Sequence, residues 1–376
     1  MRIGMEVTAA LTQGGGIGRY TRELLRALAR VDAANHYALF YASREPRHAL
    51  PPLGANFHTR ALPFHDVWLA RLWGRARVPA PVEWITGAVD VYHSPDFTLP
   101  PTRRGTRTLL TVHDLSFVRD PGSAAPGLLT YLNAVVPRSV ARADHVLADS
   151  FATRDDLIDL YKTPANKISV LYCGVEDVFR PITDPAALAA VRAKYRLGGA
   201  PFVLAVSTLQ PRKNYVRLLE ALARMADPEL RLVFAGGKGW LYDSIFAAVE
   251  RLGLRERVTF MGFVDDADLP ALYTAARILA YPSLYEGFGL PMLEAMACGT
   301  PVVASTASCL PEVAGDAALL IDPYDVAALA EALTRAHTDE PLRATLIDLG
   351  RRRAAGFRWD ESARQLIALY TRLCQG

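Results

Sequence analysis

The sequence predicts an α/β protein made of two doubly wound domains that follow one another along the chain. Strand-like apolar runs alternate with helical patterns almost throughout, which is typical of a parallel sheet covered on both faces. This alternation starts again near Phe202, after a stretch rich in Pro, Gly and Ala. The chain has 376 residues, which is too long for one ordinary hydrophobic core and suits two domains.

In the first half, six short segments have the apolar character of buried strands. Helical patterns fill the gaps between them, as at Tyr20–Arg30 and Leu128–Ala141. The predicted strands are Arg2–Val7, Tyr37–Tyr41, Val89–His93, Thr108–Val112, His145–Ala148 and Ile168–Leu171.

The second half repeats the pattern, with helices predicted at Tyr215–Met225 and Tyr242–Leu252. Its predicted strands are Phe202–Ser207, Leu230–Ala235, Val258–Met261, Ile278–Tyr281, Val302–Ala304 and Ala318–Ile321. We place the linker in the stretch 174–201, which contains one short helix, Pro185–Tyr195. The predicted domains are residues 1–178 and 196–356, and we expect a final helix over 359–376 to pack back toward the first domain.

Composition narrows the class of protein. The net charge of +3 does not indicate a nucleic-acid binder. We expect no signal peptide, because Met1 to Gly4 leads directly into a strand-like run, and no apolar run is long enough to span a membrane. The cysteines lack metal-ligand or disulfide spacing and indicate reduced thiols in a cytoplasmic protein. They are Cys173, Cys298, Cys309 and Cys374.

The stretch 285–303, YEGFGLPMLEAMACGTPVV, carries the most chemical information. It follows a predicted strand, and its glycines Gly287 and Gly289 allow a ligand to approach the backbone closely. Pro291 suits the first turn of a helix, whose free N–H groups attract an anion such as phosphate. We expect Glu294, on the first turn, to bind a ribose diol, and Glu286, before the glycines, to accept hydrogen bonds from sugar hydroxyls.

The alternative is that these glutamates only cap a helix, because acids favour the first turn. Two features argue against it. Glu286 lies outside the helix, and the Gly-Phe-Gly turn has more glycine than a cap requires.

Arg212 and Lys213 lie between a predicted strand and the following helix. Adjacent cations at a strand's carboxyl end can neutralise a pyrophosphate, Arg as a fork and Lys as a point charge. Two solvated basic residues are the plainer interpretation when the pair is taken alone.

The double-glutamate stretch resembles the signature of retaining glycosyltransferases of family 4, which have the GT-B fold, and the resemblance covers nearly the whole chain. The mannosyltransferase-like branch that builds bacterial polysaccharides is the most similar. The matching segments are 14–20 (GGGIGRY), 112–115 (VHDL), 207–214 (STLQPRKN), 285–303, 310–320 and the final Trp359-Asp360 helix.

The resemblance implies a set of site residues in both halves. For catalysis it implies Glu286, His113, Arg212 and Lys213. For donor binding it implies Glu294, Gly287, Phe288, Gly289, Leu290, Gly16, Ser207 and Gly262. It also implies that no metal and no cofactor are needed.

Near the end of the predicted strand Thr108–Val112, His113 alone would suit a structural role as well as a contact to the transferred sugar. Asp114 is predicted to orient it or to close a turn. We expect the two domains to face each other across a central cleft, where small-molecule sites commonly lie. His93 and Asp96 are expected to face this cleft, within reach of the acceptor.

Two motifs are interpreted as false leads. Asp266-Ala267-Asp268 matches the DxD pattern of metal-dependent transferases, but it precedes a helix, so N-capping is simpler. The segment 236–239 (GGKG) lacks the spacing of a P-loop and is predicted to be a loop at the cleft. The glycine cluster 14–18 lacks the acid of a dinucleotide fingerprint, which disfavours a dehydrogenase. We interpret it as a loop that packs against the donor phosphates or the acceptor.

We therefore expect a metal-independent transferase that moves a hexose, best mannose from GDP-mannose, to a saccharide or lipid-linked saccharide in polysaccharide biosynthesis. The resemblance implies retention, with front-face attack, because no residue is an obvious nucleophile. Other nucleotide-sugar enzymes of this fold, such as an epimerase or a glucan-synthase-like polymerase, remain open. So does a protein that binds the nucleotide sugar without turnover.

The segment 68–78, WLARLWGRARV, suggests peripheral membrane contact. On a helix Trp68, Leu69, Leu72 and Trp73 share one face, and arginines beside tryptophan favour anionic headgroups. The alternative is an ordinary amphipathic helix whose tryptophans pack on the sheet.

Overall fold

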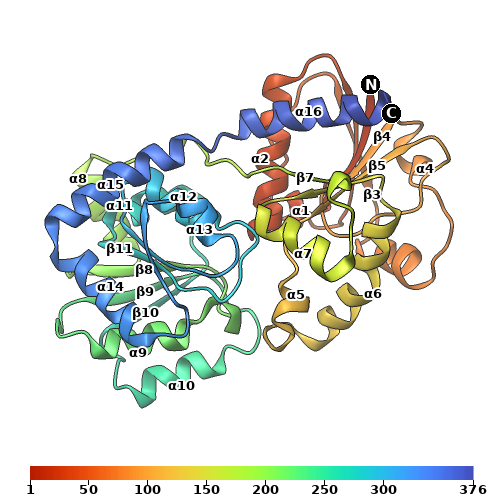
Figure 1. Cartoon of the computed structure of the whole chain (residues 1–376). Coiled ribbons are helices and arrows are strands. Elements are labelled where there is room, and N and C mark those ends of the chain that lie inside the picture. The colour runs from red at the N-terminus through yellow and green to blue at the C-terminus, as the bar shows by residue number, and fades with distance from the viewer. Residues whose placement is uncertain (376) are drawn as a thin grey trace. The chain divides into compact units, whose positions relative to one another are not determined.

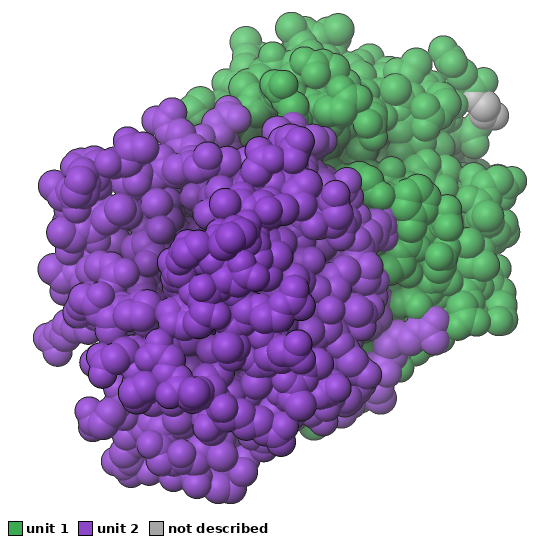
Figure 2. Space-filling model, turned by 60° about the vertical axis from the view of Figure 1, so that its left-hand side comes forward, with its two compact units in different colours: residues 1–118, 126–174, 358–376 green, residues 119–125, 175–357 purple. Residues whose placement is uncertain are grey.

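The computed structural model describes residues 1–375 and confirms the predicted class, with two parallel sheets covered by helices (Figure 1). The chain divides into two compact units, shown in separate colours in Figure 2. Unit 1 comprises residues 1–118, 126–174 and 358–376, and unit 2 comprises 119–125 and 175–357. The first domain was predicted to end at residue 178, and the place of 119–125 in unit 2 was not predicted.

Unit 1 contains a seven-stranded sheet of order β3-β2-β1-β4-β5-β6-β7, in which every pairing is parallel. The strands are β1 Arg2–Glu6, β2 His36–Ala42, β3 Phe57–Leu62, β4 Val91–Ser94, β5 Arg107–Val112, β6 His145–Ala148 and β7 Ile168–Val170. The helices are α1 Thr8–Thr12, α2 Gly16–Val31, α3 Val67–Leu69, α4 Glu83–Thr86, α5 Ser116–Arg119, α6 Pro126–Arg142, α7 Phe151–Tyr161 and α16 Trp359–Gln375.

Strand β3 is not among the predicted strands. This strand forms one edge of the sheet, and its four central side chains are exposed. An edge strand with a mostly polar sequence has neither of the two patterns that indicate a strand, which are a continuous apolar run and a strict alternation of apolar and polar residues.

The C-terminal helix α16 packs on α2 and β4, within unit 1 (Figure 1). Asp360 pairs with Arg30 of α2, and the hydroxyl of Tyr370 lies 2.7 Å from His93 Nδ1 of β4. The last helix of the chain therefore completes the N-terminal unit.

Unit 2 contains a six-stranded sheet of order β10-β9-β8-β11-β12-β13, again with only parallel pairings. The strands are β8 Phe202–Val206, β9 Arg231–Ala235, β10 Val258–Gly262, β11 Ile278–Tyr281, β12 Val302–Ser305 and β13 Ala318–Ile321. The helices are α8 Pro185–Lys194, α9 Tyr215–Arg224, α10 Asp243–Arg251, α11 Leu269–Ala275, α12 Leu290–Ala297, α13 Leu310–Ala314, α14 Val326–Thr338 and α15 Glu340–Ala355.

A separate apolar core supports each sheet. In unit 1 it includes Phe40, Tyr92, Leu110, Val136 and Val146. In unit 2 it includes Leu218, Leu222, Leu232, Phe234 and Leu333. Each sheet also has a point where strand order reverses, between β1 and β4 and between β8 and β11. Doubly wound sheets bind ligands beyond the carboxyl ends of the strands at such points.

The tryptophan-rich segment does not present the predicted face. After α3, residues Ala70–Arg75 form a π-helix, Leu69 is buried, and the indole N–H of the half-buried Trp73 donates to Ala80 O at 2.9 Å. Trp68 is 59 % exposed. Much of the predicted apolar face, including Leu69 and Trp73, therefore packs on the protein itself. None of the helices within residues 1–375 is long and apolar enough to cross a membrane.

Candidate active site

The reversal point of unit 2 brings the predicted cations and glutamate together. Strands β8 and β11 are neighbours, so the loops that leave their carboxyl ends emerge side by side. The first loop ends in a 3₁₀ turn, Pro211–Lys213, and the second carries Glu286. Residues separated by more than 70 positions in sequence thus meet at one edge of the sheet.

Glu286 accepts hydrogen bonds from both cations. Its Oε2 lies 2.9 Å from Arg212 Nη1, and its Oε1 lies 2.6 Å from Lys213 Nζ. The Glu286 and Lys213 side chains are each 7 % exposed and that of Arg212 16 %. Burial disfavours the carboxylate, but the charges of Lys213 and Arg212 outweigh it and lower the pKa of Glu286 to about 2. The cluster is therefore ionised at neutral pH and carries one net positive charge.

Neighbouring loops hold this cluster rigidly. Ser308 Oγ accepts from the Glu286 backbone N–H and donates to the Glu286 carbonyl, both at 2.8 Å. Asn214, in a left-handed conformation at φ 60°, donates to the carbonyls of Pro282 and Pro323 at 3.0 and 2.7 Å. Arg212 also donates to the carbonyl of Tyr285. Such fixed surroundings preorganise the charges for a ligand.

The glycine turn leads into α12 as predicted. Gly289 has φ of +100°, a conformation that favours glycine, and a Cβ there would also crowd the end of the Leu310 side chain at 3.0 Å. Gly287 and Phe288 are buried, and Leu290 and Pro291 begin the helix. The N–H groups of this first turn are the donors that the sequence assigns to phosphate.

Glu294 differs from the expectation in two ways. It is the fifth residue of α12, so it lies on the second turn and not the first. It is also buried, at 3 % exposure, and its Oε2 accepts from the hydroxyl of Tyr273 at 2.7 Å. The helix begins at Leu290, one residue before the proline, which moves Glu294 further along it. Both glutamates are thus buried.

Ser207 and Gly262 lie at the same edge of this sheet. The Ser207 N–H donates to Ala235 O at 3.0 Å, and the Gly236 N–H donates to Gly262 O at 2.8 Å. At Gly236, a Cβ would lie 1.9 Å from Ser207 O, so only glycine fits. The Gly-Gly-Lys-Gly segment therefore packs against the loop after β8, and Lys238 lies over the rings of Tyr242 and Phe246.

In unit 1, His113 pairs with an aspartate that the sequence analysis did not single out. His113 and Asp149 directly follow Val112 and Ala148, which are partners in the register of β5 and β6. Asp149 Oδ2 lies 2.7 Å from His113 Nδ1, and the Pro95 carbonyl lies 2.8 Å from Nε2. Burial opposes the charged ring, but Asp149, Asp96 and the Pro95 carbonyl together raise the pKa of His113 to about 9.

Of the other predictions for unit 1, the one for His93 is wrong, and the turn role offered for Asp114 is confirmed. His93 is fully buried, and both ring nitrogens are bonded, to Tyr370 and Thr111, so it serves the core and not the acceptor. Asp114 accepts from the Ser116 N–H at 2.9 Å and closes a turn, while Asp149 takes the orienting role. Asp96 is half-buried and influences the charge of His113.

The first glycine segment is mostly helical. Gly15 precedes α2 and Gly16 begins it, so the helix starts four residues before the predicted Tyr20. At Gly18, a Cβ would lie 2.0 Å from Gln13 O, which gives this glycine a packing reason. A Cβ at Gly16 would meet nothing within 4 Å, so its surface is open to a ligand.

The Asp266-Ala267-Asp268 motif does not cap a helix with its side chains. Asp268 accepts instead from Lys194 Nζ at 2.5 Å and from the Tyr195 hydroxyl at 2.6 Å, and so ties α8 to α11. Across residues 1–375, no group of three or more His, Cys, Asp or Glu side chains is arranged to hold a metal ion. All four cysteines are free thiols, and three of them are buried.

Comparison with known proteins decides the family. Residues 14–179 match the family model described as Glycosyltransferase Family 4, and residues 190–353 match that of Glycosyl transferases group 1. The chain is 34 % identical to O-antigen chain mannosyltransferase B of Escherichia coli over 374 residues, which cover 94 % of this chain and 95 % of that protein. The chain belongs to the group 1 glycosyltransferases.

Solved structures agree with the GT-B architecture of this glycosyltransferase. Sucrose-phosphate synthase from Thermosynechococcus elongatus is similar with a TM-score of 0.78 and 25 % identity, over 99 % of both chains. The Anabaena protein Alr3699/HepE, solved with UDP and glucose, is similar with a TM-score of 0.75 and 21 % identity, also over 99 % of both chains. The second likeness concerns the fold alone.

Proposed function

We propose that this glycosyltransferase moves a hexose from a nucleoside-diphosphate sugar to a saccharide or lipid-linked saccharide during polysaccharide biosynthesis. Mannose from GDP-mannose is the donor we favour. The support for mannose is the name of the Escherichia coli relative, which is similar to this chain over 95 % of its length. The support for a nucleotide donor is the cationic cluster at the reversal point of unit 2.

The arrangement of Glu286 between Arg212 and Lys213 carries this proposal. Cleavage of the bond from the anomeric carbon to phosphate leaves negative charge on the diphosphate. Arg212, Lys213 and the first N–H groups of α12 would stabilise that charge without reorganising, which is how preorganised donors accelerate a reaction. Glu286 would give up some of its hydrogen bonds from Arg212 and Lys213 and accept hydrogen bonds from the sugar hydroxyls instead. These bonds would fix the orientation of the reacting carbon.

Glu294 would bind the ribose of the donor. A carboxylate offers two acceptor oxygens for a vicinal diol, and the Tyr273 hydroxyl, 2.7 Å from Oε2, sets the orientation of this one. A buried carboxylate without a hydrogen-bond partner costs free energy. The contact with Tyr273 therefore supports a single, defined orientation of the Glu294 carboxylate.

We propose retention of configuration by front-face attack, with no metal. Two cations beside the α12 N-terminus supply the positive charge that a divalent ion provides elsewhere. Asp268, the acid of the DxD motif nearest to α11, is engaged by Lys194 and Tyr195. His113, held protonated by Asp149, would donate to the transferred sugar from Nε2, in exchange for the hydrogen bond that this nitrogen makes to the Pro95 carbonyl.

We also propose peripheral contact with a membrane through Trp68, beside which Arg71 lies 5.1 Å from the ring centroid. Exposed tryptophan with arginine favours anionic interfaces. Sedimentation with anionic liposomes should therefore capture the protein, less at high salt. Trp68→Ser should reduce capture, whereas Trp84→Ser, a control at another exposed tryptophan, should not. Absence of capture at low salt would favour a soluble acceptor.

A thermal-shift screen across nucleotide sugars tests the donor assignment. A ligand of the native state raises the melting temperature, so GDP-mannose should give a larger rise than UDP-glucose, UDP-galactose or free nucleosides. A larger rise with a UDP-sugar would indicate that this nucleotide sugar, and not GDP-mannose, is the donor. Equal and negligible rises with all nucleotide sugars would contradict a donor site in unit 2.

A further inference from the structure

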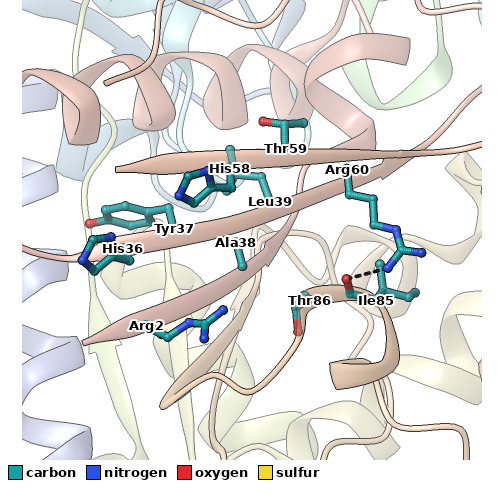
Figure 3. A pocket seen from close by; sticks show the side chains of 10 residues that line it. All are labelled: Arg2, His36, Tyr37, Ala38, Leu39, His58, Thr59, Arg60, Ile85 and Thr86. Atoms are coloured by element: carbon teal, nitrogen blue, oxygen red, sulfur yellow. Dashed lines mark hydrogen bonds between the residues drawn. The ribbon is translucent and has the colours of Figure 1, made fainter. Parts of the chain in front are cut away.

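A pocket of about 260 Å³ opens in unit 1 beside the edge of the sheet (Figure 3). Three strands and the end of α4 form it. The residues that line it are Arg2, His36, Tyr37, Ala38, Leu39, His58, Thr59, Arg60, Ile85 and Thr86. Four of these ten are basic, which is the feature that requires an explanation.

The strand register explains why the basic side chains share one face. Arg2 of β1 is the partner of His36 in β2, and Ala38 is the partner of His58 in β3. Partners in parallel strands point the same way, and every second residue returns to the same face. Arg2, His36, His58 and Arg60 therefore project from the same side of three adjacent strands.

A small residue leaves room between the basic side chains. Gly4 and Ala38 are partners in β1 and β2, but side chains of Thr86, Val89 and Tyr92 cover Gly4, so the hollow lies over the methyl group of Ala38. Figure 3 shows Ala38 with the basic side chains on several sides. A larger residue at position 38 would fill the hollow.

Both arginines reach the end of α4. Arg60 Nη1 donates to Ile85 O at 3.2 Å, the bond drawn as a dashed line in Figure 3. A Cβ on Gly87, directly after α4, would lie 3.6 Å from a guanidinium nitrogen of Arg2. The partial negative charge of a helix C-terminus helps to hold two like charges near each other.

The pocket offers these cations no acidic side chain. None of the ten described residues that line it is Asp or Glu. Asp90 accepts from the main-chain N–H of Arg2 at 2.7 Å, and the Asp32 carboxylate accepts from Tyr37 and Asn35. Two guanidinium groups and two imidazoles around a hollow form the donor set that oxyanions prefer.

This pocket is separate from the catalytic edge of the sheet. Arg2 and His36 are the first residues of β1 and β2, whereas His113 follows the last residue of β5. All strands of this sheet are parallel, so the pocket lies at their amino ends and His113 at their carboxyl ends. The proposed donor and acceptor chemistry does not use the amino ends.

We propose that this pocket binds a small phosphate ester as a second, non-catalytic ligand. Its volume is below the roughly 300–1,000 Å³ of sites for drug-sized ligands, so a hexose phosphate or a phosphate headgroup fits better than a nucleotide sugar. The two guanidinium groups bind the phosphate oxygens, and the imidazoles of His36 and His58 contact the rest of the ligand. The inference does not depend on the transferase donor.

A site-resolved measurement separates this pocket from the phosphate site proposed in unit 2. The ring-proton NMR signals of His36 and His58, assigned from His36→Gln and His58→Gln, are followed in the untagged chain. The additions are glucose 6-phosphate, inorganic phosphate, glucose as a neutral control, and vesicles of phosphatidic acid or of phosphatidylcholine. We expect glucose 6-phosphate and phosphate to move both signals, and glucose to leave them in place.

Variants test charge and space independently. Arg2→Gln with Arg60→Gln should weaken binding about tenfold or more, as expected when charged hydrogen bonds are lost. Ala38→Leu keeps every charge but fills the hollow, and should abolish binding. Arg231→Gln is the matched control, an exposed arginine that begins strand β9 of unit 2, and should bind as the parent does. Melting curves and the other histidine signals report whether each variant folds.

The outcomes separate the sources of the ligand. A response to phosphatidic acid vesicles alone, sensitive to the same variants, would assign the phosphate to a lipid headgroup and support the site. The proposal is overturned if no phosphate compound moves the two signals, if glucose moves them equally, or if Ala38→Leu binds normally. It is also overturned if Arg231→Gln loses binding as much as the arginine pair does.

Discussion

The Lys213 ammonium lies 2.6 Å from one oxygen of Glu286, in a position where both side chains are 7 % exposed. With Arg212 on the other oxygen, the glutamate holds two cations at the carboxyl edge of the unit 2 sheet. This pairing determines how substitutions at the site affect turnover and the stability of the fold.

We predict that Glu286→Gln lowers turnover by ~10²–10³, the usual loss when a preorganised contact is removed. It should also destabilise the fold by about 3–5 kcal/mol at pH 7, because two buried cations lose their partner. The folded pKa of about 2 lies below the ordinary 4.5, so this stabilisation is present above pH 4.5 and is lost as pH falls toward 2.

Denaturant unfolding of both proteins between pH 7 and 3.5 measures this effect. The stability difference between parent and Glu286→Gln should shrink by about 1 kcal/mol over that range. Glu331→Gln, at an exposed glutamate of α14, is the control and should cost little at any pH. A difference that does not change with pH would contradict the ion cluster.

Much of this site could be predicted from the sequence, because the place of each residue depends on the strand that directly precedes it. Arg212, Lys213 and Glu286 each follow a recognisable strand, and the carboxyl ends of adjacent parallel strands share one edge. The direct pairing of Glu286 with both cations could not be predicted, because side-chain distances depend on how two loops pack. Burial of Glu294 was missed for a related reason, since the start of α12 decides which turn it occupies.

Asp149 illustrates what a single sequence conceals. Its segment, Ala148-Asp149-Ser150, ends a strand just as Val112-His113 does, and that shared position is the signal that could have paired the two. Using it requires the strand order, which places β5 beside β6. Trp73 and β3 show a second limit of prediction from the sequence. The pattern of apolar and polar residues alone does not say whether a given face packs on the core or lies in solvent.

We predict that the His113 ring keeps its proton at pH 7.5 and titrates near 9. A raised folded pKa stabilises the fold fully below the ordinary 6.5, and this contribution is lost as pH rises through 9. NMR titration of the ring checks the midpoint. Asp149→Asn should lower it well below 9, whereas Asp114→Asn should change it less, because Asp114 bonds to a backbone N–H and not to the ring.

For the cations, we predict that Arg212→Ala or Lys213→Ala weakens binding of GDP by roughly 10–100-fold, the value of a charged hydrogen bond to phosphate. Binding of guanosine should hardly change, because base contacts are untouched. Isothermal calorimetry with both ligands measures this, with Arg224→Ala at the exposed end of α9 as control. Equal losses for nucleotide and nucleoside would remove the phosphate role.

We predict that activity survives chelation by EDTA, because we propose that Arg212, Lys213 and the α12 amides supply the positive charge. Initial rates before and after dialysis against EDTA, with Mg²⁺ or Mn²⁺ restored, are the measurement. An absolute metal requirement would return Asp266 and Asp268 to consideration, and Asp268→Asn would then be the variant to assay.

We propose that the Glu286 cluster supports the transfer of a sugar from a nucleoside diphosphate. The direct measurement is release of GDP from GDP-mannose, with and without a mixture of oligosaccharide and lipid-linked acceptors, in the parent, Glu286→Gln and Glu331→Gln. We expect release that depends on acceptor, matches formation of a mannosylated product, and falls ~10²–10³ only in Glu286→Gln. If the parent binds nucleotide sugars but none yields acceptor-dependent product, or if Glu286→Gln matches the control, the claim is contradicted.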